Sequence, residues 1–138
     1  MDLTFLHLLS LVITIPVVLY ADHLGFQYFT GRKLVLDRKK IEWSHRLVMI
    51  GISLLIVTGI VVTVPVWAVM FSQPLFYAKL ALVSTLVING LFIGKLMHKA
   101  TITPYTELSA EEKRVLLLSG ALSAGGWLGS ILIGFLGL

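Results

Sequence analysis

The sequence predicts an all-α fold, a polytopic membrane protein in which residues 1–138 form a single four-helix transmembrane domain. Three observations lead to this prediction. The chain is 57% hydrophobic and 13% charged, whereas soluble domains are about 45–50% apolar and about 25% charged. Four apolar stretches approach or reach the roughly 20 residues that a helix needs to cross a bilayer. Most lysines and arginines lie between these stretches rather than within them.

The four apolar stretches predict four spans in chain order. Pro16 lies inside the first span and is expected to kink it, because proline removes a helical hydrogen bond. Pro65 ends the second span, and Pro74 suits the first turn of the third. No basic segment or small-residue cleavage site precedes the first span, so we expect a retained helix rather than a signal peptide. The spans cover residues 3–20 or a little beyond, 46–64, 74–97 and 115–138.

The distribution of basic residues predicts the orientation of the chain. Residues 24–44 carry five lysines and arginines, and residues 95–114, from the end of the third span to the start of the fourth, carry four, whereas residues 65–73 carry none. Because basic loops stay in the cytoplasm, we expect both long connections inside and both termini outside. The main predicted partner is the lipid bilayer, and the family resemblance given below implies the inner (plasma) membrane of a bacterium as the location. This topology explains the net charge of +4, and no motif for nucleic-acid recognition is present.

Local patterns predict further details of the connections and of the fourth span. Residues 32–43 mix leucines with basic residues, which predicts a short helix on the inner leaflet. Ser109 and Glu112 form a capping box, so the fourth helix should begin before the membrane. Small residues recur at four-residue steps in the fourth span, a pattern that allows close helix packing. They are Gly125 with Gly129, and Gly126 with Ser130 and Gly134.

Ionisable side chains at membrane depth are costly and are therefore functional candidates. His7 in the first span and Lys79 in the third lie at a matching depth near the outer face. Four more candidates gather at the inner boundary, namely Asp22, His23, His45 and His98. His7 and His23 are sixteen residues apart, about 24 Å along a helix, so they cannot share one iron atom. The sequence therefore predicts two separate polar centres.

Each candidate also has a purely structural interpretation. A lysine near a span end, such as Lys79, can extend its charge to the interface. The inner histidines can contact lipid phosphate or water, and Asp22 can pair with Arg46 or His45. Asn89, near the middle of the third span, fits an interhelical hydrogen bond.

The residue inventory excludes several chemistries. The chain has no cysteine, which excludes disulfides, thiolate metal sites, iron–sulfur clusters and covalent haem attachment. Phosphate-binding loops and the common hydrolase motifs are absent, and no catalytic residue is predicted. Haem b held by histidines from separate helices is compatible with the sequence.

Two stretches carry a resemblance to a known group. The first span opens Phe5-Leu-His-Leu-Leu, and the third contains Tyr77-Ala-Lys-Leu-Ala-Leu-Val83. Together they resemble four-helix bacterial membrane proteins that include the oxygen-independent membrane protoporphyrinogen oxidase and the membrane domain of the copper-resistance D family. The resemblance implies that His7 and Lys79 are functional positions associated with haem b. The sequence departs from the oxidase at Asn89-Gly90, where that family tends to have a Tyr-His pair.

These observations support three hypotheses about function. The first is a membrane redox protein that binds haem b, with His7 or His45 as iron ligand, and exchanges electrons with a quinone or a porphyrin. The alternative is a non-catalytic accessory or scaffold subunit that contacts a membrane partner or a second copy through the fourth helix. A proton or small-ion pathway through Asp22, Lys79 and the histidines ranks last, because few polar residues besides Asn89 connect the two ends.

Overall fold

The computed structural model describes residues 3–135 and confirms the all-α fold. Each of the four long helices is long and apolar enough to cross a membrane, so the chain is a multi-pass membrane protein. Short helical turns complete the path, and the described residues include no strand. The long helices are α1 (Leu3–Phe29), α2 (Arg38–Thr63), α4 (Pro74–Lys99) and α5 (Ala110–Phe135); the short ones are η1 (Val64–Val66), α3 (Trp67–Met70) and η2 (Tyr105–Glu107).

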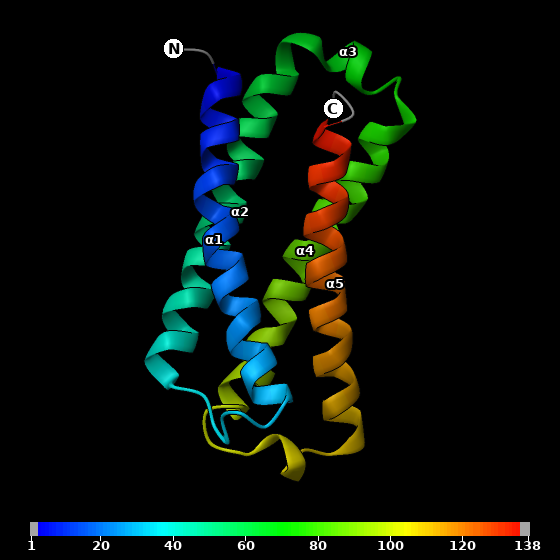
Figure 1. Cartoon of the computed structure of the whole chain (residues 1–138). Helices are drawn as coiled ribbons and strands as arrows, with labels where there is room; N and C mark the ends of the chain where they lie inside the picture. Colours follow the sequence, from blue (N-terminus) through cyan, green and yellow to red (C-terminus); the bar gives the residue numbers. More distant parts are fainter. Residues whose placement is uncertain (1–2, 136–138) are drawn as a thin grey trace.

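The four long helices form two hairpins. Helix α1 packs along α2, α4 packs along α5, and the hairpins meet mainly through α2 and α4. The first residues of α1 and the last residues of α5 lie at the end of the bundle that carries α3, which we call the α3 end (Figure 1). Residues 30–37 and 100–109 lie at the opposite end, which we call the connection end (Figure 1).

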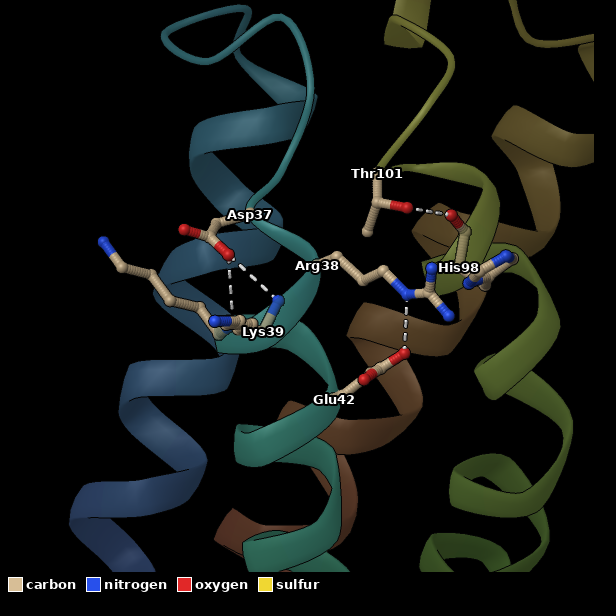
Figure 2. A network of polar contacts seen from close by, with 7 residues as sticks. Asp37, Arg38, Lys39, Glu42, His98 and Thr101 are labelled. Carbon is tan, nitrogen blue, oxygen red and sulfur yellow. Dashed lines mark hydrogen bonds and ion pairs between the residues drawn. The ribbon is translucent and has the colours of Figure 1, made fainter.

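The first two long helices extend further than the sequence predicted, and the expected surface helix over residues 32–43 is wrong. Helix α1 runs on to Phe29, and α2 already begins at Arg38. Asp37 caps α2, because its carboxylate accepts hydrogen bonds from the backbone N–H groups of Lys39 at 2.9 Å and Lys40 at 3.4 Å (Figure 2). The physical reason for the error is that a helix can continue past the bilayer, where charged side chains are tolerated.

A cluster of buried side chains joins the two hairpins at the connection end. Tyr28 is 1% exposed, and its hydroxyl donates a hydrogen bond of 2.6 Å to the carbonyl oxygen of Thr103. The backbone N–H of Leu36 donates to the carbonyl oxygen of Ala100 at 2.9 Å. The connection after α1 is thereby fastened to the connection after α4. The buried members of the cluster are Leu24, Tyr28, Leu36, Ile41, Ala100 and Leu108.

A second buried cluster lies in the middle of the bundle and takes one residue from each long helix. Its members are Val18, Ile52, Leu86 and Trp127. These residues hold all four helices around a common centre.

Glycines allow the close helix contacts around this centre. A Cβ atom at Gly126 would lie 2.7 Å from a methyl group of Leu86, and one at Gly129 would lie 2.8 Å from a methyl group of Leu82. The predicted close packing of the fourth span is therefore confirmed against α4. A Cβ at Gly125 or Gly134 would meet nothing within 4 Å, so these two residues face open space.

The capping box of the fourth span is also confirmed. The backbone N–H of Glu112 donates to the Ser109 hydroxyl at 3.1 Å, and the backbone N–H of Ser109 donates to the Glu112 carboxylate at 3.0 Å. Lys99 adds an ion pair to Glu112 at 2.5 Å. Helix α5 consequently starts at Ala110, five residues before the predicted span at 115.

Candidate functional site

A cavity of about 390 Å³ lies among the four long helices, in the half of the bundle nearer the connection end. Its volume falls in the range of roughly 300–1,000 Å³ that is usual for small-molecule and cofactor sites. Most of the lining is apolar, but each helix contributes at least one polar side chain. These polar residues are Asp22, Ser44, His45, Asn89, Ser119 and Ser123. We call this space the central cavity.

His45 of α2 is half-buried and lines the central cavity. Its Nε2 atom lies 4.0 Å from the position that a Cβ atom of Gly94 would take, so the glycine leaves room for the ring beside α4. Neither ring nitrogen makes a hydrogen bond with any residue in the described part of the chain. Both nitrogens are thus available to a ligand in the cavity.

Asp22 of α1 lines the same cavity and contacts α5. One carboxylate oxygen, Oδ1, accepts a hydrogen bond from the Ser123 hydroxyl at 3.4 Å. The expected pairing of Asp22 with Arg46 or His45 does not occur among residues 3–135, where Asp22 makes no ion pair. The carboxylate therefore keeps most of its acceptor capacity for another partner.

Asn89 and Ser119 link α4 to α5 at the wall of the cavity. The Ser119 hydroxyl donates to Oδ1 of Asn89 at 2.7 Å, and Nδ2 of Asn89 donates to the backbone carbonyl of Ser119 at 3.2 Å. The predicted role of Asn89 in an interhelical hydrogen bond is confirmed. This reciprocal pair fixes the polar wall of the cavity where α4 packs against α5.

A second polar centre lies in the other half of the bundle, nearer the α3 end. Nδ1 of His7 lies 2.8 Å from the hydroxyl oxygen of Thr58. Thr58 donates its only hydroxyl proton to the carbonyl of Leu54 at 2.7 Å, so we infer that it accepts a proton from His7. Nε2 of His7 then carries the lone pair. Lys79 of α4 lies within electrostatic range of His7, so the two predicted residues share the same half of the bundle.

The two centres are far apart. Thr58, which holds His7, and His45 are thirteen residues apart on α2, or about 20 Å along the helix axis. One iron atom cannot bind both histidines, in agreement with two separate centres. The described residues also contain no group of three or more His, Asp or Glu side chains suited to a metal ion.

The other two histidine candidates do not line the central cavity. His23 is exposed on α1, and His98 is exposed on α4. Figure 2 shows His98 beside the ion pair between Arg38 and Glu42, with its backbone carbonyl accepting a hydrogen bond from Thr101 at 2.6 Å. The predicted inner group of four is thus divided, and only Asp22 and His45 reach the cavity.

Sequence reasoning missed three serines that line the cavity, namely Ser44, Ser119 and Ser123. The spacing of Ser119 and Ser123 could have indicated that they act together, because residues four apart share one face of a helix. Ser119, Ser123 and Trp127 follow one another at four-residue steps on α5, and all three line the cavity.

No family model, curated protein or solved structure matches the chain. Membership of the family suggested by the His7 and Lys79 stretches therefore remains a proposal.

Proposed function

We propose that the protein is a membrane redox protein that binds haem b in the central cavity, with His45 as an axial ligand. The observation that carries the proposal is the His45 ring, which borders the cavity and has both nitrogens free of hydrogen bonds to the described residues. Neutral imidazole is a common axial ligand of haem iron. When bound, haem supplies one-electron chemistry that the side chains of this chain lack.

The residues around the cavity suit a haem group. The lining is largely apolar and belongs to four helices, as a flat macrocycle in a helical bundle requires. Met49 and Met97 also line the cavity, and thioether sulfur pairs with histidine on haem iron in some cytochromes. Met97, on α4, would be the second residue to hold the group, because Met49 follows His45 by one helical turn and lies on the same face of α2.

The centre of His7, Thr58 and Lys79 is proposed to bind the electron partner, a quinone or a porphyrin. The Lys79 ammonium suits the carboxylates of a porphyrin or the carbonyl oxygen of a quinone. The Nε2 lone pair of His7 is placed to accept the proton that accompanies electron release from such a molecule. The resemblance in the first and third spans favours the same two residues.

The proposed location is the bacterial inner membrane, with the connection end in the cytoplasm. Both basic connections lie at this end of the bundle, and residues 64–73 lie at the other (Figure 1). The uncharged sequence of that linker fits an outward orientation under the positive-inside rule.

An absorbance spectrum of the protein purified in mild detergent, before and after dithionite, tests the proposal. We expect a Soret band that sharpens and shifts on reduction, and its loss in His45→Ala. The matched controls His23→Ala and His98→Ala should retain the band, because neither residue lines the cavity. His7→Ala should also retain it but should slow reduction by a quinol or a porphyrinogen. A Soret band unchanged in His45→Ala would refute the assignment.

The accessory-subunit alternative has one observation in its favour, the open faces of Gly125 and Gly134 on α5. A partner helix or a second copy can approach closely at such positions. Colourless protein from haem-supplied cells that retains a membrane partner in detergent would favour this alternative. Loss of that partner in Gly125→Leu would locate the contact.

A further inference from the structure

The side of the central cavity between α1 and α5 lacks the close packing found elsewhere in the bundle. The helix pairs with extensive contact are α1 with α2, α4 with α5, and α2 with α4. Residues of α1 and of α5 nevertheless line the cavity together. The cavity is thus bounded on this side by two helices that do not pack tightly against each other.

Small residues border the cavity where α1 and α5 face each other without close packing, a boundary that we call the seam. Ala21 and Gly25 lie on α1, and Gly120 and Ala124 lie on α5. A Cβ atom at Gly25 or at Gly120 would meet no other atom within 4 Å. The space between the two helices is consequently open at these positions.

Asp22 is the ionisable group at this seam. Its carboxylate is exposed and has the 3.4 Å contact with the Ser123 hydroxyl described above. Seven residues separate Asp22 from Phe29, the last residue of α1, which places it about 10 Å from the helix end. Helix α1 has 27 residues and is about 40 Å long, which exceeds the roughly 30 Å hydrocarbon core, so we infer that a lipid headgroup can reach this depth. A positively charged headgroup complements the carboxylate.

Most of the lining of the central cavity is apolar, so an acyl chain placed there gains favourable contacts with the lining atoms. Lipid acyl chains surround the outer side of the seam in a bilayer, and one of them can enter the cavity between the two helices. We propose that an amine-headed phospholipid enters sideways between α1 and α5, with one acyl chain in the central cavity and its ammonium at Asp22. This inference concerns the protein without haem, because haem and an acyl chain would occupy the same cavity.

Quenching of tryptophan fluorescence by brominated acyl chains tests the proposal in vesicles. Trp127 lines the cavity and is 8% exposed, whereas Trp43 and Trp67 are 62% and 60% exposed. The protein with Trp43→Phe and Trp67→Phe leaves Trp127 as the reporter. We expect brominated phosphatidylethanolamine to quench this reporter strongly. The double variant Gly25→Leu/Gly120→Leu should lose at least half of the quenching, because the leucines fill the seam.

Gly125→Leu is the matched control, since it adds the same side chain at an open position of α5 that does not line the cavity. It should keep the full quenching. Asp22→Asn should abolish the preference for brominated phosphatidylethanolamine over brominated phosphatidylglycerol. The single variant Gly25→Leu, checked for helix content by circular dichroism, carries the test if the double variant does not fold.

Two results would overturn the proposal. Equal quenching in the seam variants and in Gly125→Leu would show that bromines reach Trp127 from the outer surface only. Equal quenching by both brominated lipids in the parent protein would remove the role of Asp22. Neither result bears on the absorbance spectrum, so failure here is distinct from failure of the haem proposal.

Discussion

Replacement of Gly51 by alanine should weaken the contact between α1 and α2. A Cβ at Gly51 would lie 2.5 Å from Oγ1 and 2.6 Å from Cγ2 of Thr14. Both branches of the threonine face the glycine, so rotation about χ1 cannot clear the clash. Thr14 is 3% exposed, and its hydroxyl donates to the carbonyl of Ser10 at 2.6 Å. The helices must therefore separate, or this hydrogen bond must break.

The net effect on the free energy of unfolding follows from three contributions. Overpacking of a tight contact costs about 1–3 kcal/mol, and loss of the Thr14 hydrogen bond costs about 0.5–1.5 kcal/mol. Alanine recovers about 1 kcal/mol of helix propensity. We expect Gly51→Ala to destabilise the protein by about 0.5–3.5 kcal/mol.

Unfolding by sodium dodecyl sulfate in mixed micelles, followed by circular dichroism, measures this difference. Gly25→Ala is the control, because its Cβ meets nothing within 4 Å; it should be neutral or slightly stabilising. Thr14→Ala should restore most of the stability lost in Gly51→Ala by removing both clashing atoms. If Gly51→Ala were as stable as Gly25→Ala, the close approach of α1 and α2 at this point would be refuted.

Three further predictions concern hydrogen bonds described above. Tyr28→Phe should lower the free energy of unfolding by about 1 kcal/mol in the same assay, because it leaves a buried carbonyl unpaired; Tyr20→Phe, on the exposed surface of α1, should have no effect. Ser119→Ala should cost about 0.6–1.7 kcal/mol, the range for interhelical hydrogen bonds in membranes. Thr58→Val removes the acceptor of the His7 ring and should slow reduction by a quinol several-fold, measured by stopped-flow absorbance, with the Soret band unchanged.

The number of spans and their order were predictable, because hydrophobic length is a strong signal in a membrane protein. The capping box at Ser109 and the interhelical role of Asn89 were also predictable from short patterns. The boundary between α1 and α2 was not, since charged residues were interpreted as the end of a helix. The actual boundary depends on Asp37, whose capping contacts are invisible to a hydropathy profile.

The rotation of each helix about its own axis could not be predicted from the sequence. A helix that is apolar on every side has no polar face to indicate the direction of the core. His45 and Arg46 are adjacent in sequence, yet the first lines the central cavity and the second does not. For the same reason, the sequence could not distinguish His45 from His23 or His98 as the residue at the cavity.

The division into two hairpins has a consequence for the biosynthesis of the chain. Helices α1 and α2 pack along each other, so the first half can assemble in the bilayer before the ribosome has made the second. The Tyr28 and Leu36 contacts to Thr103 and Ala100 must wait for the second hairpin. Because residues 64–73 are the covalent link between the halves, two separately expressed fragments divided there should find each other in the membrane. Fastening at the connection end would then be the last step of assembly.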